Sequence, residues 1–167
     1  MFERSGPVFW SGRLHPTGAM IAQGPVGPVS FDAEDGAITR LIRGDGGTLR
    51  DGPLFEAAQL QLASYFEGTG QGFDLPLRPA GSVFQQRFLT VLQDIPYGET
   101  RTYGELASLL GVSAQAVGRA CGANPIAILI PCHRVLGRDD LGGYSGPGGI
   151  DAKVALLRIE GAAGLLI

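Results

Sequence analysis

Residues 126–135 have the sequence IAILIPCHRV, and the fold of the chain is best worked out from this stretch. The uninterrupted apolar run of five residues, 126–130, is typical of a strand buried on both faces. Pro131 fixes its own φ and has no N–H to donate, so the strand is expected to end there. The pattern therefore places Cys132 at the carboxyl end of a buried strand, with His133 directly after it.

Cys132 has two interpretations at this point. A single cysteine at a strand end usually packs as a small hydrophobic side chain. A thiol becomes a nucleophile as the thiolate, which a neighbouring base or cation favours, and His133 and Arg134 follow Cys132 at once. In an extended chain His133 points away from Cys132, so it would act through a water molecule. Cys121 falls within a predicted helix among small residues, and we interpret it as inert packing.

Upstream of this stretch, residues 102–122 predict two short helices joined by a tight turn. Thr102 and Glu105 have the spacing of a capping box at the start of the first helix. Ser113 is placed to cap the second helix, which runs to about Gly122. This spacing is typical of a helix-turn-helix motif, whose second helix carries the DNA-facing side chains. A helical hairpin in a core has the same pattern, so both interpretations remain open.

Downstream, a glycine-rich loop covers residues 142–149 and precedes a last predicted helix over 151–160. Glycines allow a backbone to approach a ligand closely, and Tyr144 offers a face for stacking. A surface turn with a half-buried tyrosine would look the same.

The first eighty residues are richer in turns and short apolar segments. Asp35-Gly36 is a good hairpin turn, and residues 53–66 have the period of an amphipathic helix. Short strands are predicted at residues 8–10, 19–22, 29–31 and 38–42. Residues 68–81 hold four glycines and two prolines, which is typical of a domain boundary.

The predicted fold class is α/β, of the α+β type. Residues 1–80 form a small strand-rich N-terminal domain with one helix. Residues 82–167 form a mostly helical C-terminal domain that begins with a helix capped by Ser82 and carries the helix-turn-helix and the Pro-Cys-His-Arg segment.

Composition excludes several classes of protein. The chain has 167 residues, of which 44% are apolar and 17% charged, so it can bury a sizeable core. It has no apolar run long enough for a membrane span and no signal-peptide pattern at its start. Two cysteines make neither a disulfide framework nor a four-ligand zinc set, so we expect a cytoplasmic protein with reduced thiols.

The net charge of −3 argues against a nucleic-acid partner when it is considered alone. The charge is unevenly distributed, however: residues 101–138 hold four arginines and one glutamate, a local net charge of +3. So few charges can also arise by chance, and DNA binding stays open on this ground.

Three motifs together resemble the O6-alkylguanine-DNA alkyltransferase family. They are Pro-Cys-His-Arg-Val at 131–135, Gly-Tyr-Ser-Gly at 143–146, and a Lys-x-x-Leu-Leu-x-x-Glu-Gly pattern at 153–161. The resemblance is close over residues 82–161, whereas residues 1–81 match the family only in their order of strands and helix.

The resemblance implies direct DNA repair. A methylated-DNA–protein-cysteine S-methyltransferase flips the alkylated guanine out of double-stranded DNA and transfers the alkyl group irreversibly to a cysteine, once per molecule. No cofactor and no metal are implied, since the zinc-binding cysteines of some relatives' N-terminal domains have no counterpart here. We expect a monomer, in the cytoplasm and on the nucleoid when it is bound to DNA.

The resemblance also implies a role for each site residue. Cys132 is the acceptor, His133 deprotonates it through water, and Glu160 orients His133. Tyr103 donates to the leaving guanine with help from the Ser145 backbone. The remaining implied roles are a hinge at Asn124, a wall beside the flipped base at Tyr144, an anchor for the closing loop at Lys153, and DNA contacts at Ser113, Gln115, Ala116, Arg119 and Arg134.

Gln115 departs from the family pattern. The family normally has arginine there, and this arginine fills the hole left by the flipped base. Arg119 lies one turn further along the same face and could partly replace it. Gln115 therefore keeps a second hypothesis open, that of an alkylated-DNA binding protein with weak or no transferase activity. A third, a thiol hydrolase using Cys132 and His133, would leave the helix-turn-helix unexplained.

Overall fold

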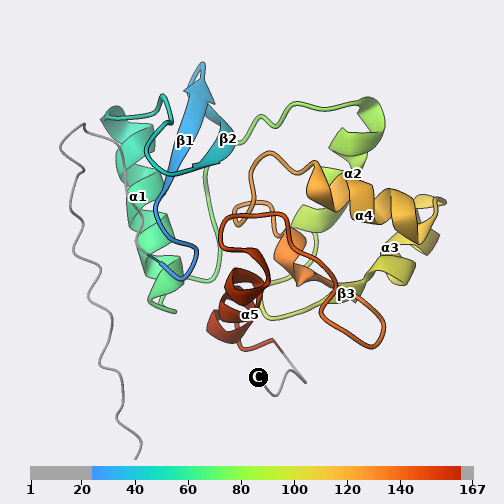
Figure 1. Cartoon of the computed structure of the whole chain (residues 1–167). Coiled ribbons are helices and arrows are strands. Elements are labelled where there is room, and N and C mark those ends of the chain that lie inside the picture. Colours follow the sequence, from blue (N-terminus) through green and yellow to red (C-terminus); the bar gives the residue numbers. More distant parts are fainter. Residues whose placement is uncertain (1–23, 163–167) are drawn as a thin grey trace, which may run out of the picture.

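A two-stranded hairpin and a long helix are followed by four shorter helices that surround an irregular central segment (Figure 1). The computed structural model describes residues 24–162. The elements in chain order are β1 (Val29–Glu34), β2 (Ala37–Arg43), α1 (Gly52–Phe66), α2 (Val83–Gln93), β3 (Arg101–Thr102), α3 (Tyr103–Leu110), α4 (Ala114–Gly122), the 3-10 helix η1 (Cys132–Arg134), β4 (Val135–Leu136) and α5 (Gly149–Ile159). The mixed fold class predicted from the sequence is confirmed.

The hairpin of β1 and β2 forms around the predicted turn. The strands are antiparallel, and Asp35 and Gly36 both have positive φ, at 48° and 76°. Such angles suit a two-residue hairpin turn and explain why Asp-Gly is found there. The predicted strands at 29–31 and 38–42 fall within β1 and β2, whereas those predicted at 8–10 and 19–22 lie outside the described residues.

The segment predicted as a domain boundary packs against the hairpin. Ile38 of β2 accepts a backbone hydrogen bond from Arg78 (2.7 Å) and donates one to Pro76 (2.8 Å), which makes a parallel bridge at Leu77. Buried side chains from both sides of this segment form one hydrophobic cluster, which includes Phe31, Leu62, Phe88 and Leu156. The division into residues 1–80 and 82–167 stays a prediction.

The prediction of a strand at residues 126–130 is wrong. These five residues are all buried, but they form tight turns with a single bridge between Ala127 and Ile130, and Ile128 has φ of +74°. An apolar run indicates burial without showing which backbone conformation provides it. Asn124 provides hydrogen bonds that a neighbouring strand would otherwise provide. Its side chain accepts from the Ile126 N–H (3.0 Å) and donates to the Ile130 carbonyl (2.9 Å).

Side-chain caps begin three of the helices, as predicted. The Thr102–Glu105 capping box of α3 is complete, and Ser113 accepts from the Ala116 N–H at the start of α4 (3.1 Å). Ser82 caps α2, but the box predicted with Gln85 is only half formed. The Gln85 side chain instead donates to the Ala120 carbonyl (2.9 Å) and so ties α2 to α4.

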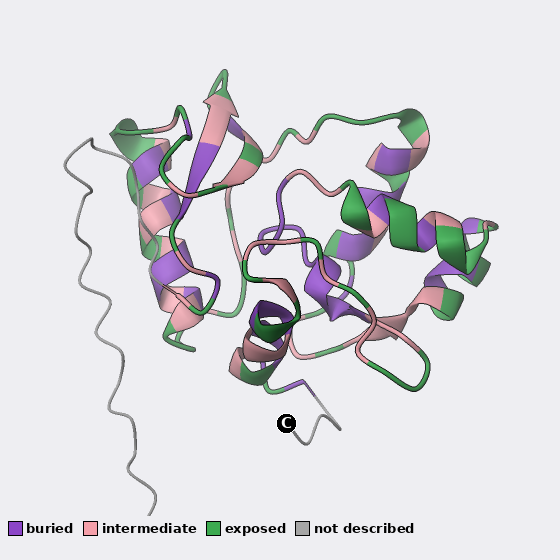
Figure 2. Ribbon diagram, viewed as in Figure 1, coloured by how far each residue is buried: buried purple, intermediate pink, exposed green. Residues whose placement is uncertain are grey.

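Helices α3 and α4 present an outer face to solvent. Gly111 ends α3 in the left-handed region with φ of 68°, so three residues suffice to turn the chain into α4. Figure 2 shows exposed residues along both helices, whereas the central segment beside them is buried. None of the helices in residues 24–162 is long and apolar enough to cross a membrane.

Candidate active site

Cys132 lies at the first residue of η1 rather than at the end of a strand. It is 5% exposed and lines a cavity of about 410 Å³. The cavity walls come from α3, α4, η1 and the loop before α5, and the lining residues are Tyr103, Gly118, Cys121, Gly122, Cys132, Gly143, Tyr144 and Ser145. A volume in this range suits a small-molecule ligand of the size of a nucleobase with a substituent.

The thiol of Cys132 is not activated by its surroundings alone. Burial raises its pKa, and this outweighs the opposing effects of a hydrogen bond with Asn124 and the positive charge of Lys153. The neutral thiol therefore predominates near neutral pH, and a nucleophilic reaction needs a base to remove its proton.

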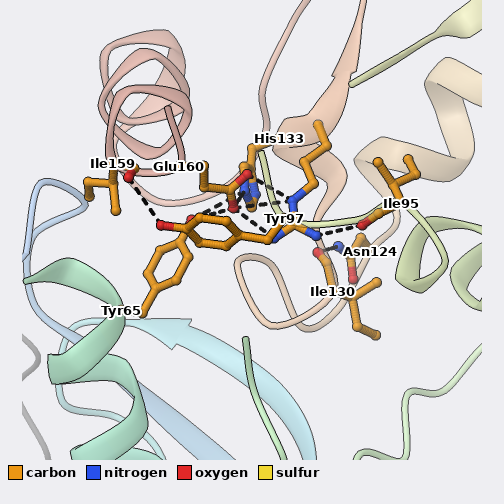
Figure 3. A network of polar contacts seen from close by, with 9 residues as sticks. Tyr65, Ile95, Tyr97, Asn124, Ile130, His133, Ile159 and Glu160 are labelled. Atoms are coloured by element: carbon orange, nitrogen blue, oxygen red, sulfur yellow. Dashed lines mark hydrogen bonds and ion pairs between the residues drawn. The ribbon is translucent and has the colours of Figure 1, made fainter. Parts of the chain in front are cut away.

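The base next to it is held by a buried carboxylate. The Nε2 atom of His133 lies 2.8 Å from Oε1 of Glu160, the residue directly after α5, and both side chains are buried (Figure 3). Burial opposes the charged form of Glu160, but hydrogen bonds from His133 and Arg134 outweigh it and lower the pKa of Glu160 to about 2. Glu160 is therefore ionised and can only accept.

This contact decides the tautomer of His133. Because Glu160 only accepts, Nε2 must carry the hydrogen. Burial lowers the pKa of His133, against the opposing effect of Glu160, so the ring is neutral and Nδ1 keeps its lone pair. Nδ1 is also buried without a hydrogen-bond partner among residues 24–162. A neutral imidazole with a free Nδ1 has the chemistry of a general base.

Arg134 takes a different place from the one predicted. Its guanidinium donates to Glu160 through Nη2 (2.8 Å) and Nε (2.9 Å) and to the Ile95 carbonyl through Nη1 (2.7 Å). It also lies over the Tyr97 ring, 5.8 Å from its centroid, and is only 8% exposed. This placement contradicts the expectation that Arg134 contacts DNA, because its donors are used in the interior.

Tyr65 of α1 also reaches this network, and sequence reasoning did not single it out. Its hydroxyl donates to Oε1 of Glu160 (2.7 Å), and its ring is fully buried (Figure 3). A tyrosine on the core face of a predicted helix implies a buried hydroxyl in need of a partner. That signal was present, but the partner lies 95 residues further along the chain.

Lys153 links the loop before α5 to the segment that follows Cys132. Its buried ammonium donates to the carbonyls of Val135 (2.7 Å) and Gly143 (2.9 Å). Tyr103 forms another wall, and Gly142 packs closely on it, since a Cβ at Gly142 would stand 2.6 Å from the Tyr103 ring. The loop can therefore fold over the cavity only with glycine at this position.

Tyr144 and Ser145 complete the loop side of the cavity. The Tyr144 hydroxyl is buried and has no hydrogen-bond partner among residues 24–162, whereas Ser145 is exposed at the rim. A buried hydroxyl without a partner in a cavity wall is free to bond a bound molecule.

Helix α4 contributes to both the cavity and the surface. Gly118, Cys121 and Gly122 line the cavity, while Gln115 and Arg119 are exposed. Gln115 lies one turn before Gly118 and so near the cavity mouth. Cys121 was interpreted as packing from the sequence, and the structure adds that it lines the same cavity as Cys132. Burial raises the pKa of its thiol to about 12.

Two further residues predicted to contact DNA, Ser113 and Ala116, also make contacts within the protein. The Ser113 hydroxyl caps α4, and Ala116 is half-buried beside a second cavity that Phe84 and Arg119 also line.

Comparisons with known proteins find similarity to one family. Residues 83–162 match the family model described as "6-O-methylguanine DNA methyltransferase, DNA binding domain". The methylated-DNA–protein-cysteine methyltransferase of Methanosarcina acetivorans is 38% identical over 153 residues, which cover 85% of this chain and 97% of that protein. The protein of the same name from Mycolicibacterium paratuberculosis is 43% identical over 146 residues, or 81% of this chain and 87% of the relative.

Solved structures show the same similarity. The crystal structure of Mycobacterium tuberculosis OGT in complex with DNA superposes with a TM-score of 0.72 at 42% sequence identity, covering 84% of this chain and 90% of the other. The crystal structure of M. tuberculosis O6-methylguanine methyltransferase also gives a TM-score of 0.72, at 40% identity, covering 88% of this chain and 94% of the other.

Proposed function

The chain belongs to the 6-O-methylguanine DNA methyltransferase family, and from this premise we propose which of its residues perform the transfer. The protein repairs DNA directly by moving an alkyl group from O6 of guanine onto one of its own cysteines, and its partner is DNA. The acceptor is Cys132. The observation that carries this assignment is that Cys132 lines the cavity and is followed in the sequence by His133, which forms a buried pair with Glu160.

The reaction needs one proton transfer before the displacement. The proton of the Cys132 thiol passes through a water molecule to Nδ1 of His133, whose imidazolium form Glu160 stabilises across Nε2. The thiolate attacks the alkyl carbon in line with the C–O6 bond. A carbon–sulfur bond forms, the C–O6 bond breaks, and its electron pair goes to guanine.

The leaving guanine takes up a proton, so that overall the hydrogen of the thiol replaces the alkyl group on the base. Tyr103 is placed in the cavity wall to donate a hydrogen bond to the leaving base, and the Ser145 backbone supports it. The thioether on Cys132 has no leaving group that water could displace easily, which makes each molecule act once.

The alkylated base must leave the duplex to reach Cys132, because the thiol is buried in the wall of a cavity. Tyr144 is the wall beside the flipped base. Lys153 anchors the closing loop through Gly143, and Asn124 is the hinge that joins α4 to the loop before Cys132.

The surface that meets the DNA is the exposed face of α4. Ser113 and Ala116 lie at its start, where backbone N–H groups favour a phosphate, and Gln115 and Arg119 extend from it. Arg134 is withdrawn from this set, because it is bonded to Glu160 in the interior.

The DNA substrate also supports a cytoplasmic location, on the nucleoid when the protein is bound. Within the described part of the chain, no three His, Cys, Asp or Glu side chains come together in a way that could hold a metal ion.

A duplex oligonucleotide with a radiolabelled alkyl group on O6 of one guanine tests this function against its rivals. We expect one equivalent of label to move onto the protein and stay there. Label that remains on tightly bound DNA would mean a binding protein, and continued release of a labelled small alcohol would mean a hydrolase.

Glu160→Gln is expected to slow transfer without abolishing it. The amide still accepts from His133 but lacks the charge that stabilises the imidazolium, a loss of about 1–2 kcal/mol or about 5- to 30-fold in rate. Since Glu160 raises the pKa of His133, its removal should also move the acid limb of the pH–rate profile to lower pH. Single-turnover rates across pH, at a temperature where both proteins are folded, check this. Superimposable profiles would exclude Glu160 from the relay.

Gln115→Arg is expected to raise transfer from duplex DNA more than transfer from free O6-alkylguanine. A guanidinium can fill the hole left by the flipped base, while the free base needs no flipping. We expect the ratio of the two rates, duplex over free base, to rise about tenfold at fixed salt, the effect of about 1.4 kcal/mol.

Ser108→Arg on the exposed surface of α3 is the matched control for added positive charge and should leave that ratio near the wild-type value. An unchanged ratio in Gln115→Arg would mean that Arg119 already performs the role of the family's arginine.

A further inference from the structure

Tyr65 connects the N-terminal part of the chain to the pair of His133 and Glu160. It lies in α1, outside residues 83–162 that match the family model. Its hydroxyl donates to Oε1 of Glu160 at 2.7 Å and lies 3.4 Å from Nε2 of His133 (Figure 3). The side chain is fully buried, so water cannot replace this bond.

Aromatic neighbours hold the Tyr65 ring in place. Its centroid lies 5.1 Å from that of Phe73, 5.7 Å from that of Phe66 and 6.2 Å from that of Tyr97. The contacts with Phe66 and Tyr97 are edge-to-face, an arrangement that aromatic pairs favour. The ring is thus fixed on several sides, and its hydroxyl is directed at Glu160.

Three side chains donate to one oxygen of Glu160. Oε1 accepts from the Tyr65 hydroxyl (2.7 Å), from Nε2 of His133 (2.8 Å) and from Nη2 (2.8 Å) and Nε (3.2 Å) of Arg134. Each donor draws on the same negative charge, so each lessens the charge that acts on the other two. Burial and the charge of Glu160 raise the pKa of Tyr65, which keeps the phenol a donor at any working pH.

We propose that Tyr65 is a positioning residue of the proton relay, which fixes Oε1 of Glu160 against His133 and limits how strongly the carboxylate acts on the imidazole. The inference rests on the proposed function of His133 and Glu160. It means that the N-terminal part of the chain, besides supporting the fold, helps to set the strength of the base that activates Cys132.

The charged and titratable groups around His133 come from several elements. Glu160 after α5 is the negative group in contact with it, and the positive charges of Arg134 and Lys153 oppose protonation. The groups to be considered are Glu160, Arg134, Lys153, Cys132, Tyr65 and Tyr97.

The test is the titration of the His133 ring by NMR in the full-length protein. In Tyr65→Phe the ring stays in its aromatic surroundings but the donor is lost, so more of the Glu160 charge acts on the imidazole. We expect the pKa of His133 to rise by about half a unit to one unit. The chain has two histidines, and a His15→Gln variant assigns the signals.

Two further variants serve as a control and as a test in the opposite direction. Tyr97→Phe is the matched control, because its hydroxyl bonds the Ile159 carbonyl (3.1 Å) rather than Glu160, and the His133 titration should stay in place. Incorporation of 3-fluorotyrosine at position 65, a stronger donor of nearly the same shape, should lower the pKa of His133. This variant also keeps the proposal testable if Tyr65→Phe does not fold.

Transfer rates provide the functional readout. On the acid limb of the pH–rate profile, Tyr65→Phe should be about three- to tenfold slower than the wild type at the same pH, as expected for that pKa rise. Its limb moves to higher pH, opposite to the shift expected for Glu160→Gln. An unmoved His133 titration would overturn the proposal for Tyr65 alone, whereas a wild type that accepts no alkyl group would overturn the proposed function.

Discussion

Cys132→Ala is expected to lose alkyl transfer completely and to keep its affinity for alkylated duplex DNA. In the proposed mechanism the Cys132 sulfur forms the new bond, and the methyl group of alanine cannot take its place. The DNA-binding surface that we propose is the exposed face of α4, whereas Cys132 is buried in the cavity. Label transfer to the protein and DNA binding at one fixed salt concentration measure the two properties separately.

Cys121→Ala is the matched control, because the same substitution is made in the same cavity. Cys121 has no adjacent base, and its thiol has a pKa of about 12, so transfer should continue at a rate within about threefold of the wild type. If Cys121→Ala were inactive and Cys132→Ala active, the assignment of the acceptor would be wrong.

Arg134→Met is expected to destabilise the protein by about 3–5 kcal/mol, because it leaves the Glu160 carboxylate buried without its guanidinium partner. The Ile95 carbonyl also loses its donor. Methionine retains much of the apolar length of the side chain, so the loss is mainly electrostatic. The free energy of unfolding in urea at neutral pH, from the linear extrapolation, measures the effect.

Arg138→Met provides the comparison. Arg138 is exposed and lies four residues further along, so its replacement should change the free energy of unfolding by less than about 0.5 kcal/mol. If Arg134→Met were as stable as the wild type but bound DNA with a weaker salt dependence, Arg134 would be a phosphate contact after all.

Features that depend on neighbouring residues were predicted well. The caps at Ser82 and Ser113 and the box of Thr102 with Glu105 depend on side chains three residues away from the backbone N–H groups that they bond. The Asp35-Gly36 turn depends on two adjacent residues that tolerate a positive φ. Such local interactions can be predicted from neighbouring residues in the sequence, because they do not depend on the rest of the fold.

The strand predicted at 126–130 shows where that approach fails. Five apolar residues correctly indicated burial, but the backbone conformation depends on which partners are available. Here Asn124 bonds both ends of the segment, and Ile128 takes a positive φ, so the run folds on itself instead of pairing. The sequence motif around Cys132 can thus be recognised correctly even when the backbone conformation before the cysteine is predicted wrongly.

The active-site network could be predicted only in part. The pair of His133 and Glu160 followed from the family resemblance. The placement of Arg134 did not, because a charge pattern shows the sign of a residue and not whether its partner, 26 residues away, is buried with it. The distant partner of Tyr65 was hidden for the same reason, since a long-range contact appears only after folding.

The central claim is that Cys132 receives one alkyl group and keeps it. The direct measurement is the mass of the protein after incubation with excess O6-methylguanine duplex, followed by digestion with trypsin. Cleavage after Arg119 and Arg134 releases residues 120–134, which contain both cysteines, so fragmentation of that peptide must locate the added mass. We predict a gain of one methyl group per molecule, located on Cys132, with no further gain over time. A methyl group on Cys121, or an unchanged mass while the DNA is demethylated, would contradict the account.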